Sequence, residues 1–251
     1  VLLTGPTGSG KTTTLYTTLK LIATSEVNVC TIEDPIEMVE PAFNQMQVHH
    51  DIDVDFASGI RALLRQDPDI IMIGEIRDKE TAEMAIQASL TGHLVISTLH
   101  TNDASSAITR LQDIGVPPYL VNATLLGVMA QRLVRTLCSH CKVAVAPDEE
   151  GWKELTVGFN LPVPKLMFKP AGCDECRQSG YSGRVGIYEL LEMDSQIKAL
   201  VTDACEVAPI REKALKSGMD LLRISGAKKV AEGKTTIAEI MRVASPAMEE
   251  L

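Results

Sequence analysis

The chain has 251 residues, 45% of them apolar, which is enough for one large domain or for one domain with a satellite. Its formal net charge of −9 at pH 7 argues against bulk affinity for nucleic acid or anionic lipid, although a local basic patch is compatible with it. The sequence shows no run of eighteen apolar residues and no signal peptide, so we expect no membrane-spanning helix.

The first half of the chain alternates between short apolar runs and segments with helical spacing. Strands are expected over 1–4, 27–33, 70–75 and 93–99. Helices are expected over 12–24, 56–66, 79–90 and 104–115, the last two closed by glycine. The polar, proline-containing segment 34–53 is expected to be mostly loop, with room for a hairpin. Because strands and helices alternate, we predict an α/β fold with a mainly parallel sheet and helices on both faces.

The second half of the chain changes character. A longer helix is expected over 117–135, followed by a segment with little periodicity and then one strand over 186–191. From residue 194 the pattern is helical, with breaks at Pro209, Gly218 and Gly233. We therefore predict three consecutive parts: a core over 1–135, a cysteine-containing module over 136–190 and a C-terminal helical subdomain over 191–251. Since residues 1–4 already have the pattern of a core strand, we also expect a further domain to precede this chain.

The sequence GPTGSGKT at 5–12 fits the phosphate-loop pattern G-x-x-x-x-G-K-[ST]. Its glycines let successive backbone amides turn inward as a nest for phosphate oxygens, and the helix that follows adds its N-terminal dipole. Lys11 can reach the β- and γ-phosphates, and the Thr12 hydroxyl can bind Mg²⁺. A chance glycine-rich turn is the alternative, which the position between a strand and a helix disfavours. The predicted nucleotide-binding residues are Gly5, Pro6, Thr7, Gly8, Ser9, Gly10, Lys11, Thr12 and Thr13.

Carboxylates follow two of the predicted strands. An ATPase with a phosphate loop needs such a group to coordinate Mg²⁺ or to orient the attacking water. In DIIMIGEIRD, Gly74 stands where a Walker B aspartate is usual, so Glu75 is the best candidate for the general base; the alternative is a surface glutamate. Glu33 and Asp34 end the strand over 27–33, at an edge where open α/β sheets bind ligands, but an Asp-Pro turn explains them equally well.

Other polar residues could also serve a nucleotide. Ser97, Thr98 and His100 end the strand over 93–99, where they could sense a γ-phosphate; a strand-end histidine of structural use is the alternative. Arg61 and Arg65 are four residues apart on an expected helix and therefore share a face. They either stabilise phosphate charge or form a solvated basic stripe.

Two C-x-x-C pairs, Cys138 with Cys141 and Cys173 with Cys176, are separated by 31 residues. Four thiolates from such pairs can hold one tetrahedral Zn²⁺ in a closed structural site. The long separation requires an excursion, for which 145–170 is suited. Disulfides, disfavoured in a reducing compartment, and an iron–sulfur centre are the alternatives.

Together these motifs resemble the secretion ATPases, which are ring-forming motors of bacterial type II secretion and type IV pilus assembly. The resemblance extends over nearly all of 1–245, is nearest to the type II secretion ATPases, and places pilus assembly motors second. The matching segments of the Walker A, Asp box, Walker B and His box regions and beyond are GPTGSGKTTTLY, TIEDPIE, RALLRQDPDIIMIGEIRD, TAEMAIQASLTGHLVISTLHTNDA and AQRLVRTLC.

The resemblance implies a RecA-like core and a role for each candidate residue. Lys11 and Thr12 would bind phosphate and Mg²⁺, and Glu33 and Glu75 would act on Mg²⁺ and the attacking water. His100 would lie near the γ-phosphate, and Arg61 and Arg65 would contact phosphate. Members of the family add arginines from a preceding domain across a subunit boundary. That domain is absent from this sequence, so we expect this chain alone to bind nucleotide and to hydrolyse it weakly.

The resemblance further implies an ATP-hydrolysing motor for type II secretion through pseudopilus assembly, with type IV pilus assembly as the alternative. ATP, Mg²⁺ and structural Zn²⁺ are the expected cofactors. A homo-hexameric ring, an inner-membrane platform and cytoplasmic linker proteins are the expected partners, at the cytoplasmic face of the inner membrane. A RecA-like nucleic-acid translocase is disfavoured by the acidic balance and by only four Phe, four Tyr and one Trp, so no nucleic-acid partner is expected. A nucleotide-gated binding module with little turnover is the third hypothesis.

Overall fold

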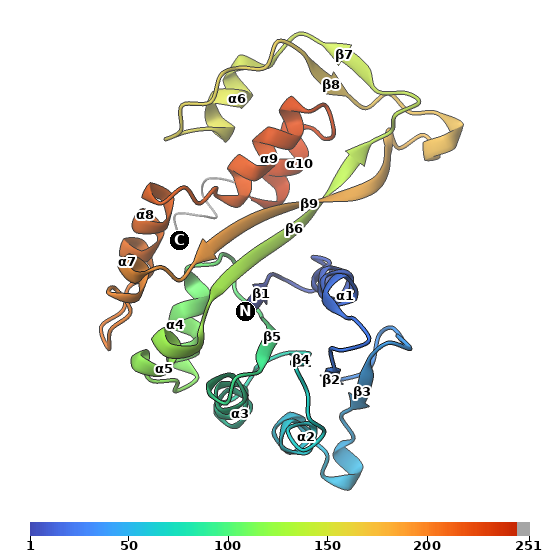
Figure 1. The fold of residues 1–251 in the computed structure, drawn as a ribbon. Helices are drawn as coiled ribbons and strands as arrows, with labels where there is room; N and C mark the ends of the chain where they lie inside the picture. Colours follow the sequence, from blue (N-terminus) through green and yellow to red (C-terminus); the bar gives the residue numbers. More distant parts are fainter. Residues whose placement is uncertain (245–251) are drawn as a thin grey trace. The chain divides into compact units, whose positions relative to one another are not determined.

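The computed structural model describes residues 1–244, and its chain folds into two units that each combine two segments (Figure 1). The first unit joins Val1–Ala130 to Leu190–Gly218, and the second joins Gln131–Glu189 to the segment that starts at Met219. The division into three consecutive parts stays a prediction, and the final residues of its third part, 245–251, lie outside the described residues.

A seven-stranded sheet has the order β3-β2-β4-β5-β1-β6-β9. All neighbouring pairs from β3 to β6 are parallel, as expected from the alternation of strands and helices. β9 runs antiparallel to β6, because Met193 N donates to Leu126 O at one end of the pair and Cys138 N donates to Gly180 O at the other. The strands are β1 (Leu2–Thr4), β2 (Val29–Glu33), β3 (Asn44–Gln47), β4 (Ile70–Ile73), β5 (Leu94–Leu99), β6 (Gly127–Leu137) and β9 (Tyr181–Glu192).

Apolar side chains bury the middle of this sheet against α1 (Lys11–Ile22). Every residue of β2 and β4 is buried, which explains why apolar residues in these strands do not alternate with exposed polar ones. Leu15 and Leu19 of α1 pack with Met72 of β4 in the core on that side. The core therefore holds the helix that follows the phosphate loop firmly against β2, which ends in Glu33, and β4, which ends two residues before Glu75.

The remaining helices of the first half are close to the expected ranges. Asp55 and Ser58 form a capping box at the start of α2, and Asp78 accepts from Thr81 N at the start of α3. Gly92 and Gly115, both with φ of 103°, follow α3 and α4 as predicted. These helices are α2 (Phe56–Leu63), α3 (Lys79–Leu90), α4 (Ser106–Asp113) and α5 (Pro118–Thr124), with the 3₁₀ turn η1 (His50–Ile52) before α2.

The helix expected over 117–135 is wrong beyond Thr124, since the chain then enters strand β6. β6 pairs with β1 in register, with Val128 opposite Leu2, so a strand 126 residues earlier in the chain decides its conformation. A Cβ atom on Gly127 would lie 2.9 Å from Leu191 O, so glycine permits the close approach of β9. Short apolar runs fit a buried strand and a helix equally well by periodicity alone.

Three smaller expectations also need correction. The segment 34–53 is mostly loop, and His49 at its end forms an isolated antiparallel bridge with Val54, but it also supplies β3, which lies parallel to β2 at the sheet edge. The strand expected over 186–191 extends to Tyr181–Glu192. Pro209 does not break the helical pattern, because it lies in the first turn of α8 (Val207–Lys216), where a missing N–H is tolerated. Breaks do occur at Gly218 and Gly233, as expected.

The second unit contains the cysteines and the excursion between them. β7 (Val143–Val145) and β8 (Met167–Lys169) form an antiparallel pair, and α6 (Glu149–Leu155) lies between them in sequence. Trp152 of α6 is buried, and Arg223 donates to the carbonyls of Leu155 and Val157. Within the described 1–244, no helix combines the length and apolar character needed to cross a membrane. The other elements are η2 (Asp174–Cys176), α7 (Ser195–Lys198), α9 (Leu222–Ala231) and α10 (Ile237–Val243).

Candidate functional site

The phosphate loop lies between β1 and α1, in the strand–loop–helix context that its sequence requires. Gly8 and Gly10 have φ of 78° and 86°, in the left-handed region that favours glycine. A Cβ on Gly8 would meet no atom within 4 Å, so backbone conformation, not space, selects glycine there. Ser9 N donates to Pro6 O over 3.2 Å and closes the turn. The loop is therefore shaped by its own backbone.

Lys11, the first residue of α1, folds back over this loop. Its Nζ donates to Gly5 O over 2.8 Å and to Pro6 O over 3.3 Å. Thr12 is half-buried on the next position of the helix, whereas Thr13, like Pro6 and Thr7, is exposed. The ammonium thus lies beside the loop backbone, near the amides that would receive phosphate oxygens.

Glu75 and His100, from the ends of adjacent strands, lie together. The two strands are in register with Ile73 opposite Ser97, and the Thr98 hydroxyl donates to Gly74 O over 2.7 Å. His100 Nε2 lies 3.3 Å from Glu75 Oε2. The other carboxylate oxygen pairs with Arg77. The Glu75 side chain is only 13% exposed, and its Oε2 has no hydrogen-bond partner within the described residues 1–244, so Arg77 alone pairs firmly with this carboxylate there.

Glu33 ends β2 as a nearly fully buried carboxylate, 4% exposed. The Tyr16 hydroxyl lies 2.8 Å from each of its oxygens, and Thr31 Oγ1 donates over 2.7 Å. Gln45 of β3 donates to both Tyr16 and Glu33. Since Thr12 and Tyr16 are four residues apart on α1, they share a face, and Glu33 lies against that face. Burial, with Glu33 next to it, raises the pKa of Tyr16, which keeps its hydroxyl a donor at neutral pH.

The two arginines expected to contact phosphate are arranged differently from each other. Arg61 of α2 donates to Glu80 of α3 over 2.8 Å, and both side chains are exposed. Arg65 lies exposed in the turn beyond Leu63, the last residue of α2. Arg61 thus forms an ion pair with a carboxylate, and Arg65 lies beyond the end of α2. A phosphate contact from either arginine stays a prediction.

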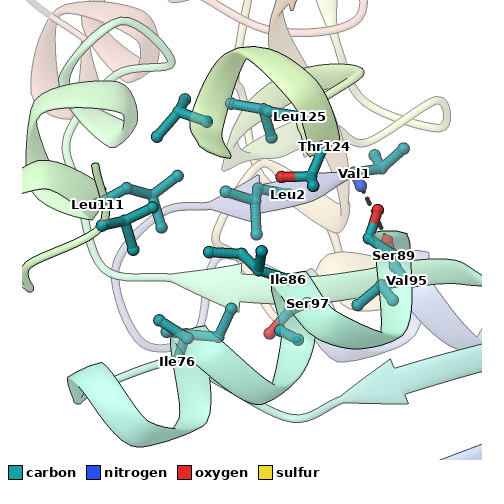
Figure 2. Close-up of a pocket in the computed structure, with 14 residues that line it drawn as sticks. Val1, Leu2, Ile76, Ile86, Ser89, Val95, Ser97, Leu111, Thr124 and Leu125 are labelled. Atoms are coloured by element: carbon teal, nitrogen blue, oxygen red, sulfur yellow. Dashed lines mark hydrogen bonds between the residues drawn. The ribbon is translucent and has the colours of Figure 1, made fainter. Parts of the chain in front are cut away.

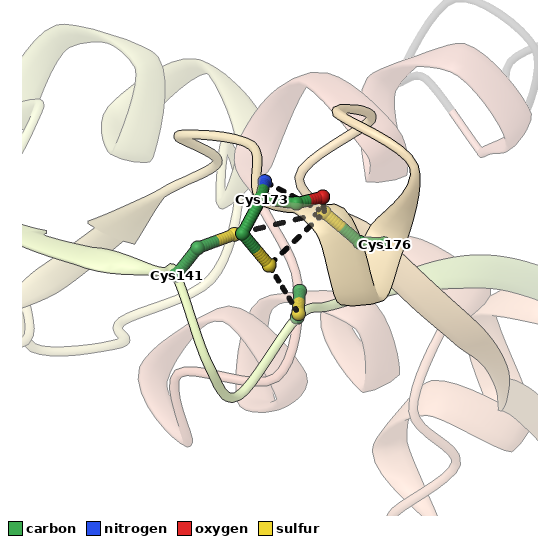
Figure 3. Close-up of side chains that lie close together, drawn as sticks. Cys141, Cys173 and Cys176 are labelled. Atoms are coloured by element: carbon green, nitrogen blue, oxygen red, sulfur yellow. Dashed lines mark hydrogen bonds between the residues drawn. The ribbon is translucent and has the colours of Figure 1, made fainter.

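The four cysteines of the two C-x-x-C pairs converge (Figure 3). Their sulfur atoms all lie within 4.8 Å of one another, and three of the separations are 3.7–3.9 Å. A tetrahedral site with Zn–S bonds of about 2.3 Å has edges of about 3.8 Å, so the cluster has the dimensions of a zinc site. Cys141, Cys173 and Cys176 are labelled in Figure 3, and Cys138 completes the set.

Backbone amides point at these sulfurs. Gly172 N donates to Cys141 over 3.3 Å, and Gly180 N and Cys173 N donate to Cys176 over 3.1 and 3.3 Å. Burial raises the pKa of Cys176, but the donors from Cys173 and Gly180 outweigh it and bring the pKa to about 6. At Cys176 the surroundings thus favour a thiolate, the form that binds metal. At Cys173, by contrast, a backbone hydrogen bond with Cys176 is outweighed by burial and the neighbouring cysteines, which raise the pKa of Cys173.

Sequence reasoning missed the residues that hold the two carboxylates. Arg77 follows Glu75 by two residues, a spacing that could have indicated the ion pair. Tyr16 and Gln45 come from α1 and β3, and only the fold brings them to Glu33. A cavity of about 60 Å³ under α3 and α5 is lined mainly by apolar side chains (Figure 2). Because ligand pockets measure roughly 300–1,000 Å³, it is too small for a nucleotide.

Known proteins match this chain over nearly its whole length. A family model described as "Type II/IV secretion system protein" matches residues 1–242. The type IV pilus assembly ATPase TfpB of Acinetobacter baylyi is 60% identical over 243 residues, which are 97% of this chain and 42% of that protein. The type II secretion system ATPase E of Vibrio cholerae is 49% identical over 244 residues, 97% of this chain and 48% of that protein.

Solved structures agree with this relationship. The pilus retraction motor PilT with bound ADP superimposes with a TM-score of 0.70 at 31% identity, over 100% of this chain and 62% of that one. The ATPase DotB of Legionella pneumophila gives 0.68 at 25% identity, over 96% of this chain and 58% of that one. The chain spans about half the length of the curated relatives described above. From the family match and these identities, the chain belongs to the type II/IV secretion system protein family.

Proposed function

We propose that this chain binds and hydrolyses ATP as the motor part of a bacterial secretion or pilus-assembly machine. The observation that carries the proposal is the pair Glu75–His100, held at the ends of two neighbouring strands whose sheet also leads into the phosphate loop. Ligands of open α/β sheets bind at that edge. The names of the relatives, which are ATPases of both machines, support the same activity.

In this proposal each residue has one task. Amides of the phosphate loop and Lys11 bind the β- and γ-phosphates. Thr12 and Glu33 hold Mg²⁺, which neutralises phosphate charge when bound. Glu75 orients the attacking water and accepts its proton, and His100 keeps that carboxylate in place beside the γ-phosphate. Arg77 is more than half exposed, so it can leave Glu75 when the nucleotide arrives.

We assign the four cysteines to a structural Zn²⁺. The sulfur–sulfur separations and the inward amides support this, and a closed set of four thiolates leaves no position for a catalytic water. The ion would join the two C-x-x-C turns, which are 31 residues apart in the sequence.

Two machines, type II secretion and type IV pilus assembly, are candidates for the one that this ATPase drives. Type II secretion is the nearer by motif resemblance, and the 60% identity to a pilus assembly ATPase supports pilus assembly. For either machine we propose a homo-hexameric ring at the cytoplasmic face of the inner membrane, acting on a platform protein and cytoplasmic linker proteins. Complementation of strains that lack one or the other ATPase separates the two candidates.

The activity itself is tested with two variants and a control. Lys11→Ala should abolish ATP binding, because the loop loses its cation. Glu75→Ala should leave binding intact and stop turnover, because only the water loses its partner. Lys20→Ala, which removes an exposed ammonium from the same helix, should change neither. Equal loss of binding in the first two variants would contradict the division of roles.

A further inference from the structure

A short loop, 100–105, connects β5 to α4 and carries His100. Directly after His100, Thr101 is joined to Thr4, the buried last residue of β1 before Gly5. Thr101 N donates to Thr4 Oγ1 over 2.8 Å, and the two hydroxyl oxygens are 2.7 Å apart. The Thr101 hydroxyl also donates to Asp103 O over 2.9 Å. Consecutive hydrogen bonds thus join Thr4, which precedes the phosphate loop, to the loop that carries His100.

Asp103 anchors the other end of this loop. Its carboxylate, 11% exposed, accepts from Ser106 N over 2.9 Å and from the Ser106 hydroxyl over 2.7 Å, and so fixes the start of α4. One of its oxygens also lies 3.1 Å from Nη2 of Arg211. The carboxylate therefore joins the loop to a second helix, α8.

Arg211 comes from α8, more than a hundred residues later in the chain but in the same unit. α4 and α8 contact each other, and the Arg211 side chain is only 18% exposed. A charge-assisted hydrogen bond that is shielded from water is strong and directional, and loss of one partner leaves the other charge buried. The loop of His100 thus depends on a cation that the phosphate-loop motif does not contain.

We propose that Arg211 is a positioning residue for ATP hydrolysis: through Asp103, Thr101 and Thr4 it fixes the His100 loop relative to the phosphate loop. Arg211 touches neither nucleotide nor water in this account, and acts only through the loop. The inference rests on the proposed ATPase activity, because His100 is assigned to the γ-phosphate there.

The test compares Arg211→Gln, Arg211→Lys and Lys216→Gln in the natural full-length protein. Lys216→Gln is the matched control, since it removes one positive charge from α8 whose partner Glu212 is exposed. Steady-state ATP turnover and hydrogen exchange of the peptide over 99–106 are measured for each. Hydrogen exchange in this peptide measures how often the loop opens, whether or not ATP is hydrolysed.

For Arg211→Gln we expect kcat to fall roughly tenfold, with KM for ATP within about twofold, because the loop is misplaced but the phosphate loop is intact. Exchange should rise over 99–106 and stay unchanged over α1. Arg211→Lys should recover part of kcat, and Lys216→Gln should match the wild type.

The proposal is overturned if exchange over 99–106 is the same in Arg211→Gln and Lys216→Gln, or if it rises equally throughout the unit. It is also overturned if KM rises as much as kcat falls. A wild-type protein that hydrolyses no ATP would refute the proposed function instead, and the exchange comparison would still decide whether Arg211 holds the loop.

Discussion

Replacing Tyr16 by phenylalanine removes one hydroxyl from the buried site of Glu33. That hydroxyl lies 2.8 Å from both carboxylate oxygens, and it accepts from Gln45 Nε2 over 2.8 Å. Thr31 keeps its 2.7 Å bond to the carboxylate, so the charge loses part of its solvation and not all of it. The variant leaves the ring and its contact with Phe43 in place.

The expected cost follows from the type of bond. A hydrogen bond to a charged group contributes roughly 1.5–3 kcal/mol, and Glu33 is too buried for water to replace the donor freely. We therefore expect Tyr16→Phe to lower the free energy of unfolding by about 2 kcal/mol. For a protein of this size, that corresponds to a fall of about 4–8 °C in the melting temperature.

Urea unfolding and thermal melting of Tyr16→Phe are compared with Tyr119→Phe, in which the altered ring is 69% exposed. The control should lie within about 0.5 kcal/mol of the wild type. If Glu33 is already glutamine, Tyr16→Phe should cost less, because the charge that needs the donor is gone. A Tyr16→Phe protein as stable as the control would show that Glu33 does not need this donor, and a full cost in the Glu33→Gln background would show that the hydroxyl acts elsewhere.

The remaining predictions concern the second unit. The hydrogen bond from Arg135, which outweighs burial, and a further bond from Arg242 lower the pKa of Glu239 to about 2. Because the pKa of Glu239 is lower in the folded than in the unfolded protein, the ionised carboxylate stabilises the fold above pH 4.5. This contribution to the free energy of unfolding is lost as the pH falls toward 2. Because both arginines are about half exposed, Glu239→Gln should cost about 1–2 kcal/mol at pH 7, measured by urea unfolding, and the difference should shrink between pH 4.5 and 3. A cost independent of pH would contradict this. Cys138→Ser should release zinc, measured by metal analysis of reduced protein, and should increase proteolysis within 136–190 while the phosphate-loop unit stays folded. Cys205→Ser, which lies outside the cluster, is the control and should retain zinc. Absence of zinc from the freshly purified wild-type protein would contradict the assignment of the four cysteines to a zinc site.

The parts of this molecule that sequence predicts well are those whose signals are local. The phosphate loop needs only its glycines, the strand before it and the helix after it. Gly92 and Gly115 close their helices because left-handed φ angles favour glycine at those positions. The four cysteines converge because two short C-x-x-C turns need only a return of the chain between them.

Long-range partners decide the parts that sequence misses. Residues 127–137 become strand β6 because β1, whose residues lie 126 positions earlier, offers an edge for pairing. Glu33 is held by Tyr16 and Gln45, and Arg61 by Glu80, through contacts that no sequence spacing records. The segment 190–218 joins the first unit because helices such as α8 pack there, through Arg211 among others. A sequence pattern predicts which side chains need burial or a partner of opposite charge, but not which distant element supplies the covering surface or the partner.

In the proposed function the phosphate loop and Glu75 act on the same triphosphate. A crystal structure of the protein with a non-hydrolysable ATP analogue and Mg²⁺ measures this most directly. We expect the β- and γ-phosphates on the amides of Gly8 to Thr12, with the Glu75 carboxylate facing a water beside the γ-phosphate. An empty phosphate loop, or a nucleotide bound with Glu75 turned away in a fully active protein, would contradict it.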